Sequence, residues 1–351
     1  MTGLHLRGLH RQRDTPLALG IGVASGLLGF AIGMPLPWML GPMIGNTIAA
    51  LMRLPVRGPD RLRPIVIPVI GVLLGFGITP EILGQLGGWA LTLVLLPLFL
   101  CVAAGWAYVV YRRIGGYDPV TAYYAAMPGG VNEMLILGVA AGGNHRQIAL
   151  AHAARILIVV LLVVLWFGLV LDVRATGTGP GMIALSALSV TDYLILGACA
   201  AVGAVVGQRI GLPAAPVFGP MILSGLVHAL GWVTVAPPSI IVIAAQIVIG
   251  TVIGARFVGA TLRDTARDLG IAVIASGGML AIGIAFAAVI AATMDMPLAQ
   301  AFLAYAPGGL TEMSLLTLTL GQDIAYVSVT HIIRIALIVA VASTVFRLIR
   351  R

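Results

Sequence analysis

Charged residues, lysine and cysteine are scarce in this sequence, and each scarcity excludes a class of protein. Only 9% of the residues are charged and 60% are hydrophobic, whereas soluble domains carry roughly 25% charged residues. So few charges cannot cover a water-facing surface, and most of the surface must therefore face lipid. Apolar runs long enough to cross the roughly 30 Å hydrocarbon core recur along the whole chain. We expect no separate soluble domain.

Lysine is absent, so every basic residue is an arginine, and the two cysteines lie inside apolar runs. The formal net charge is +8, but the arginines sit in short loops between apolar runs. That placement is typical of membrane topology determinants, and it argues against a nucleic-acid partner. Cys101 and Cys199 predict neither a disulfide framework nor a CxxC metal site. The first apolar run follows Arg7, Arg11 and Arg13, but it is long and has no convincing cleavage site. We interpret it as the first membrane helix.

The two halves of the chain repeat one unit in the same order and at a nearly constant shift. Leu40-Gly41-Pro42-Met43-Ile44 recurs as Phe218-Gly219-Pro220-Met221-Ile222, and Gly71 to Gly75 recurs as Gly250 to Gly254. Met127-Pro128-Gly129-Gly130-Val131-Asn132-Glu133-Met134 recurs as Ala306-Pro307-Gly308-Gly309-Leu310-Thr311-Glu312-Met313, and His152-x-x-Arg155 recurs as His331-x-x-Arg334. We predict a first membrane repeat at 1–174, a Gly/Thr-rich linker at 175–189 and a second membrane repeat at 190–351.

Each copy holds six apolar segments, of which the fifth carries Pro-Gly-Gly near its centre. The segments lie near 16–33, 37–54, 64–79, 87–111, 118–142 and 147–172, and then near 191–208, 214–232, 239–257, 269–291, 298–320 and 325–346. About ten residues on either side of the break give only ~15 Å of helix. The fifth segment is therefore either a broken helix that spans or a hairpin that enters and leaves on one side.

Loop charge decides between these two arrangements. If all segments span and the N-terminus is inside, the loop with Arg256, Arg263 and Arg267 falls outside, against the positive-inside rule. If each fifth segment is re-entrant, the second copy is inverted and nearly all loop arginines fall inside. These are the Arg53–Arg63 loop, Arg112, Arg113, Arg146, Arg209, the Arg256–Arg267 loop, Arg347, Arg350 and Arg351, with Arg174 outside. We predict an all-α polytopic membrane protein of two inverted-topology repeats, each with about five transmembrane helices plus a re-entrant Pro-Gly-Gly hairpin.

Inverted repeats with interrupted helices are typical of transporters, whose substrate lies near the bilayer midplane. The two hairpin tips would meet there. Gly129-Gly130 and Gly308-Gly309 permit a turn and the close approach of a ligand. Each pair precedes a new helix, whose free N–H groups attract anions.

Two acidic residues, Glu133 and Glu312, lie in the first turn of those helices. Intramembrane acids are costly and are usually functional. In the structural alternative, each glutamate caps its own helix or pairs with an arginine. In the functional alternative, each glutamate contacts the substrate or carries a proton. Asn132 and Thr311 occupy matched positions and are candidate hydrogen-bonding ligands of the substrate.

Arg155 and Arg334 lie about eight residues into the sixth segments, or ~12 Å deep. An unpaired arginine at that depth is expensive, so we expect Glu133 and Glu312, or an anionic substrate, as partners. His152 and His331 lie three residues earlier on the same helix face. They either relay protons or support the site by packing. We expect no metal site and no cofactor.

These paired motifs resemble the AbrB family of polytopic membrane proteins, and the resemblance covers nearly the whole chain. The family is also called the AbrB duplication family and has carried the labels ammonia monooxygenase and regulator of aidB expression. It is distinct from the small DNA-binding regulator of the same name. The resemblance implies regulation of gene expression or transport. We find no support for the monooxygenase label, because the sequence lacks a convincing cluster of metal ligands, and we expect no enzyme.

Our leading hypothesis is a secondary transporter or exporter of a small organic solute, most simply an anion, driven by H⁺ or Na⁺. Arg155 and Arg334 would bind the negative charge of the solute. Glu133 and Glu312 would couple transport to the driving ion or position the solute. The alternative is a ligand-sensing membrane regulator, which would need a partner protein. We expect a multi-pass protein of the bacterial inner membrane, in contact with lipid, with both termini cytoplasmic. The sequence leaves a homodimer open.

Overall fold

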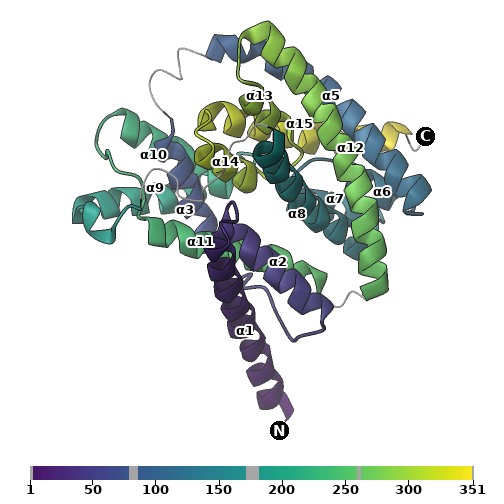
Figure 1. Cartoon of the computed structure of the whole chain (residues 1–351), viewed down its shortest axis with the longest axis horizontal. Coiled ribbons are helices and arrows are strands. Elements are labelled where there is room, and N and C mark those ends of the chain that lie inside the picture. The colour runs from purple at the N-terminus through teal and green to yellow at the C-terminus, as the bar shows by residue number, and fades with distance from the viewer. Residues whose placement is uncertain (1–2, 79–85, 171–181, 259–261, 350–351) are drawn as a thin grey trace.

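The computed structural model describes residues 3–78, 86–170, 182–258 and 262–349, and every regular element within these ranges is a helix (Figure 1). The first half contains α1 (Gly3–Ala31), α2 (Pro37–Leu51), α3 (Arg63–Phe76), η1 (Leu86–Trp89), α5 (Ala90–Val109), η2 (Val110–Ile114), α6 (Pro119–Ala126), α7 (Val131–Ala140) and α8 (His145–Val170). The second half contains η3 (Leu185–Ala187), α9 (Val190–Arg209), α10 (Ala215–Ala229), α11 (Ser239–Gly254), η4 (Ala255–Phe257), α12 (Leu262–Met294), α13 (Leu298–Tyr305), α14 (Leu310–Thr319) and α15 (Ile324–Ile349).

The described helices include six that are long and apolar enough to cross a membrane. These are Ala90–Ile114, His145–Phe167, Val190–Arg209, Ser239–Phe257, Ala266–Met294 and Ile324–Phe346. The prediction of an all-α polytopic membrane protein is therefore confirmed. Arg174 and part of the predicted 175–189 linker lie outside the described residues, as do the side chains of Arg7, Arg11, Arg13, Arg263 and Arg347 and all of Arg350 and Arg351.

The fifth apolar segment of each half is divided into two short helices at Pro-Gly-Gly. In the first half, α6 and α7 pack against each other. The backbone N–H of Asn144, which follows α7, donates to Oγ1 of Thr121 in the first turn of α6 (2.8 Å). The start and the end of this pair therefore lie together, as in a hairpin. In the second half α13 and α14 also pack against each other.

Helices of the two halves interlock through glycines. A Cβ at Gly250 of α11 would lie 2.3 Å from the carbonyl oxygen of Met39 in α2, and one at Gly254 would lie 2.5 Å from that of Met43. Small residues thus let the two backbones touch, and α2 and α11 run in the same direction. The equivalent glycines of α3, Gly71 and Gly75, contact α10 in the same way, and α3 therefore also runs parallel to α10. This swapped pairing is the one that two inverted copies would produce.

Three arginine-bearing loops lie at one end of the molecule. The guanidinium of Arg267 donates to the carbonyl oxygen of Gly115 (3.0 Å), and the hydroxyl of Tyr117 donates to Asp268 (3.4 Å). A Cβ at Gly58 would lie 3.3 Å from the backbone of α11 near the end of that helix. These contacts bring together three of the segments that the charge rule assigns to one side.

The broken helices occupy the middle of the fold. Figure 1 shows α5 and α12 side by side along one edge and α3, α9, α10 and α11 on the opposite side, with α7, α8, α13, α14 and α15 between them. α5 and α12 run antiparallel, because Trp106 bonds the Ile274 carbonyl (3.3 Å) while Thr92 contacts Met294. Two groups of helices thus enclose the hairpins.

Polar residues within the apolar helices form hydrogen bonds between helices. Asn46 donates from Nδ2 to the Ala18 carbonyl of α1 (3.1 Å), and Ser224 donates to the Val72 carbonyl of α3 (2.8 Å). Both side chains are fully buried. α2 and α10 continue through Pro42 and Pro220.

Candidate functional site

A cavity of about 230 Å³ lies between the two Pro-Gly-Gly breaks. Its lining includes every residue predicted to bind substrate, namely Gly129, Gly130, Asn132, Glu133, Arg155, Gly308, Gly309, Thr311, Glu312 and Arg334. Apolar side chains from α3, α10 and α11 complete the wall. Residues that are distant in the sequence and come from both halves thus meet at one place.

The two deep arginines bond to the backbone at the breaks. Arg334 donates from Nη1 to the Ala306 carbonyl and from Nη2 to the Gly308 carbonyl, both at 2.7 Å. Arg155 donates to the carbonyls of Met127 (2.9 Å) and, more weakly, Gly129 (3.5 Å). The carbonyls at the end of a helix have no partner within it, and a cation there also complements the helix dipole.

Of the two partners expected for these arginines, the glutamates are not the ones that the structure shows, and an anionic substrate stays a prediction. Among the described residues, neither Arg155 nor Arg334 forms a hydrogen bond or an ion pair with a glutamate, and each is held by the chain that ends α6 or α13. Both side chains are almost fully buried, and the Nε of each has no hydrogen-bond partner in the part of the chain that the structure describes. The arginines thus hold the breaks open and bring positive charge to the cavity.

The glutamates turn back on the starts of their own helices. Gly130 and Gly309 are the N-cap residues of α7 and α14, and a glycine has no side chain that could cap the helix. A Cβ at Gly130 would lie 2.0 Å from Oε2 of Glu133, and one at Gly309 would lie 1.9 Å from Oε2 of Glu312. Each carboxylate therefore lies against the helix N-terminus, where free N–H groups favour negative charge.

The glycines are thus needed for a reason that the sequence did not reveal. Neither Gly130 (φ −63°) nor Gly309 (φ −76°) has a positive φ. Other residues can adopt these backbone angles, but a side chain would displace the carboxylate. The helix-capping interpretation of Glu133 and Glu312 therefore fits the geometry, and the room that the glycines leave is filled by the protein itself.

The two hairpin tips are not equally open. Asn132 is exposed and Glu133 is half-buried, whereas Glu312 is 3% exposed. The hydroxyl of Thr311 donates to Oε2 of Glu312 (3.0 Å). The first tip is therefore accessible, and the second is closed over by protein.

The predicted histidines lie outside the cavity lining, beside the helix ends that the arginines bind. His152 contacts the guanidinium of Arg155 through Nδ1 (2.9 Å) and the Tyr124 carbonyl through Nε2 (3.0 Å). His331 lies within hydrogen-bond distance of the carbonyls of Val327 (3.0 Å) and Ala306 (3.2 Å). Both rings are fully buried, and each steadies the end of a short helix.

Sequence reasoning missed two residues of the cavity, Arg63 and Arg256, because it assigned the loop arginines to topology. Arg63 begins α3 and Arg256 lies in η4, and both line the cavity. Arg63 donates to Oδ1 of Asn132 (3.4 Å). A signal was available, since both residues stand at the edge of an apolar segment rather than within a loop.

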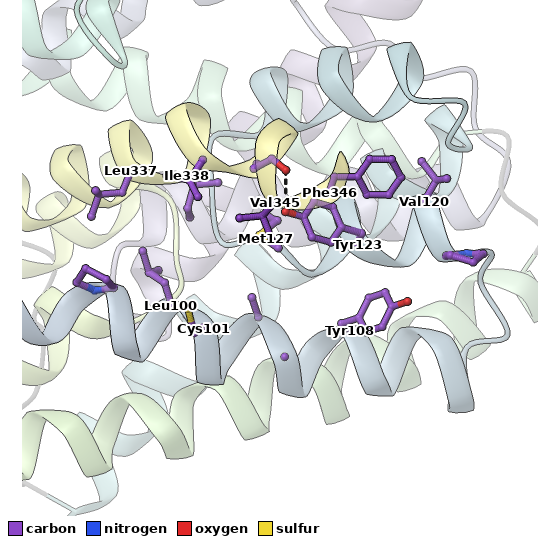
Figure 2. Close-up of a pocket in the computed structure, with 16 residues that line it drawn as sticks. Leu100, Cys101, Tyr108, Val120, Tyr123, Met127, Leu337, Ile338, Val345 and Phe346 are labelled. Atoms are coloured by element: carbon purple, nitrogen blue, oxygen red, sulfur yellow. Dashed lines mark hydrogen bonds between the residues drawn. The ribbon is translucent and has the colours of Figure 1, made fainter. Parts of the chain in front are cut away.

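A larger cavity of about 690 Å³ lies elsewhere, between α5, α6 and α15 (Figure 2). Leu100, Met127, Leu337 and Ile338 are among its lining side chains, and no charged residue lines it. The hydroxyl of Tyr123 is already bonded to the Ala342 carbonyl, as Figure 2 shows. This groove offers nothing that would hold a charged solute, so the smaller polar cavity is the better candidate site. Among the described residues, no group of three metal-binding side chains lies together.

Known proteins resemble this chain along most of its length. The family model named AbrB, described as "Transition state regulatory protein AbrB", matches residues 38–350. A Bacillus subtilis (strain 168) protein called "Uncharacterized protein YhjN" is 24% identical over 361 residues, covering 94% of this chain and 92% of the relative. An Escherichia coli (strain K12) protein called "Putative regulator AbrB" is 24% identical over 326 residues, covering 92% of each chain. The resemblance drawn from the paired motifs is thereby confirmed, and the chain belongs to the AbrB family.

Proposed function

We propose that this protein is a secondary transporter of a small organic anion, with its site in the cavity between the two hairpin breaks. The observation that carries this proposal is the convergence of both Pro-Gly-Gly breaks, both glutamates and both deep arginines on that one cavity. Interrupted helices that meet near the middle of inverted repeats are how many carriers build a site. The parallel pairing of α2 with α11 and of α3 with α10 supports the inverted arrangement.

The charge of the lining supports an anionic solute. Arg63, Arg155, Arg256 and Arg334 line the cavity, against two glutamates that already lie on helix N-termini. The volume of about 230 Å³ is below the roughly 300–1,000 Å³ of sites for drug-sized ligands. A solute of a few carbon atoms fits this space.

Transport would follow from movement of the hairpin-bearing helices against the surrounding ones. Asn132 at the first tip is exposed and lies beside Arg63, whereas Glu312 at the second tip is buried. One open tip and one closed tip would correspond to one of the two states that alternating access requires. We place the arginine-rich end in the cytoplasm by the positive-inside rule and infer coupling to H⁺ or Na⁺. No catalytic step belongs to this proposal.

Flux into proteoliposomes tests the function. We expect uptake of a labelled small organic anion by the purified protein, and its loss in a variant combining Glu133→Gln, Glu312→Gln and Arg334→Ala. Arg57→Gln, which changes an exposed arginine outside the cavity, should transport at the wild-type rate. Flux that is unchanged in the combined variant would refute the site.

The name of the Escherichia coli relative favours a second candidate function, a membrane regulator that binds its ligand without moving it. It would use the same cavity and signal through a partner protein. Saturable binding without flux, together with a protein that copurifies in a ligand-dependent way, would favour the regulator over the transporter.

A further inference from the structure

Arg63 and Arg256 stand opposite the hairpin tips without strong partners of their own. Both are half-buried in the wall of the cavity and belong to the surrounding helices rather than to the hairpins. Arg63 makes one long hydrogen bond, to Oδ1 of Asn132 at 3.4 Å. The guanidinium of Arg256 has no hydrogen-bond or ion-pair partner within the part of the chain that the structure describes. These guanidinium groups have donors to spare.

Among the described residues, no ion pair neutralises Arg63 or Arg256, and the carboxylate of Glu133 in the same cavity lies against the start of α7. The charges of Arg63 and Arg256 repel each other, and Asp60, which attracts Arg256, is exposed and outside the cavity lining. The charge of Arg63 attracts Glu312, but the carboxylate of Glu312 lies against the start of α14. Two like charges held in a cavity wall favour a bound anion that carries two negative charges.

The internal repeat indicates that this pair is not part of the architecture that the two copies share. At the shift that aligns Gly71 with Gly250 and Gly75 with Gly254, Arg63 aligns with Val242 and Arg256 aligns with Gly77. The deep arginines, which hold the helix breaks, occur in both copies. Arg63 and Arg256 occur in one copy each and at one end of the molecule. A charge that only one copy carries points to a role beyond the common architecture.

The wall between these arginines and the tips is apolar. Ile67, Val217, Ile249 and Ile253 line the cavity from α3, α10 and α11. Such a wall suits a carbon chain and gives nothing to an inorganic anion. Each guanidinium can hold one carboxylate through two parallel hydrogen bonds.

We propose that Arg63 and Arg256 are the recognition residues for a small dicarboxylate, each binding one of its carboxylates while the apolar wall contacts the carbons between them. This inference rests on the proposed function for the identity of the cavity, but it concerns binding and not movement. It names the chemical class that the site selects, which the sequence analysis left at an organic anion.

Binding measured by calorimetry in detergent tests this inference without any transport. Succinate is the probe, and propionate and inorganic phosphate are the comparisons. We expect succinate to bind at least about tenfold more tightly than either comparison, because a hydrogen bond to a charged group contributes enough for that factor. Arg63→Gln and Arg256→Gln should each weaken succinate binding by about tenfold or more, and the exposed control Arg57→Gln should leave it unchanged.

Lysine substitutions guard against a loss that reflects misfolding. Arg63→Lys and Arg256→Lys keep the charge but lose the bidentate geometry, so they should bind succinate at an affinity between wild type and the glutamine variants. Each variant should also elute as the wild type does and unfold at a similar temperature without succinate. Succinate binding that survives in the Arg63→Gln, Arg256→Gln double variant would overturn the inference, as would propionate or phosphate binding as tightly as succinate.

The two proposals can fail separately. Succinate binding that depends on both arginines, without flux in proteoliposomes, would leave the recognition pair standing and remove the transporter. Flux of a neutral or cationic solute that is insensitive to both arginines would remove the recognition pair and leave a transporter of another class.

Discussion

Replacing Arg334 tests how the hairpin breaks are held. In the native protein, this guanidinium makes two 2.7 Å hydrogen bonds to the carbonyls of Ala306 and Gly308, and its side chain is 2% exposed. A hydrogen bond to a charged group contributes about 1.5–3 kcal/mol, and a glutamine can replace at most one of the two. We therefore expect Arg334→Gln to lower the free energy of unfolding by about 2–4 kcal/mol.

The matched change at Arg155 should cost less. One of its two carbonyl bonds is 3.5 Å long, and the first tip is open enough for water to reach a freed carbonyl. We expect Arg155→Gln to lower the free energy of unfolding by about 1–2 kcal/mol. Urea unfolding in mixed micelles, followed by tryptophan fluorescence, measures both variants. Exchange of the backbone amides of Ala306, Gly308 and Gly309 should accelerate in Arg334→Gln.

A double-mutant cycle separates this account from a buried Arg–Glu pair. The arginine whose charge acts on Glu312 is Arg63, and Arg334 bonds to carbonyls. The effects of Arg334→Gln and Glu312→Gln should therefore add to within about 0.5 kcal/mol. A coupling energy well above that value, or an Arg334→Gln variant as stable as the wild type, would refute the reasoning.

Three further tests probe the contacts that shape the fold. Gly309→Ala should destabilise the protein by about 1–3 kcal/mol more than Gly130→Ala. The added Cβ would clash with the buried carboxylate of Glu312, which cannot move aside into solvent. Unfolding curves of the two variants test this difference. Gly219→Ala would place a Cβ 1.9 Å from a backbone oxygen of α9 and should lower the free energy of unfolding by about 1–3 kcal/mol. Nothing lies within 4 Å of a Cβ at Gly197, so Gly197→Ala should leave the stability unchanged. Equal thermal stability of these two variants would contradict the packing. Asp118 accepts two 3.0 Å bonds at the start of α6; burial alone would raise its pKa, but these hydrogen bonds outweigh burial and hold the pKa below its usual value. The cap is therefore present at neutral pH and lost as the pH falls below about 4, so Asp118→Ala should destabilise at pH 7 by about 0.5–2 kcal/mol and by progressively less in acid.

Much of the site could be predicted from the sequence because duplication marks it twice. A Pro-Gly-Gly in an apolar run has few structural uses, and its recurrence beside Glu133 and Glu312 identified the residues that line the cavity. The depth of Arg155 and Arg334 followed from the rise of a helix. These inferences needed only distances along the chain.

The partners of those residues could not be predicted in the same way. Depth along a helix does not tell which neighbour a side chain faces, so the carbonyls that end α6 and α13 were not foreseen as ligands of the arginines. The glycines were expected to permit a turn and the close approach of a ligand, and it was not foreseen that Gly130 and Gly309 also make room for the carboxylates. Both features depend on how side chains fold back within one turn.

Arg63 and Arg256 were not predicted as cavity residues for a different reason. The positive-inside rule gave every loop arginine a sufficient explanation, and a residue that already has an explanation is not examined for another. Comparing the two copies would have set these arginines apart, because Val242 and Gly77 stand at the matched positions. Differences between repeats carry information that their similarities hide.

The central claim is that the cavity between the hairpin breaks binds the solute, and locating a bound solute tests it most directly. A crystal structure with bromosuccinate should give an anomalous bromine peak inside the cavity lined by Gly130, Gly309 and Arg256, with its carboxylates facing Arg63 and Arg256. A bromine peak in the apolar groove of Figure 2, or an empty cavity at saturating bromosuccinate, would contradict the account.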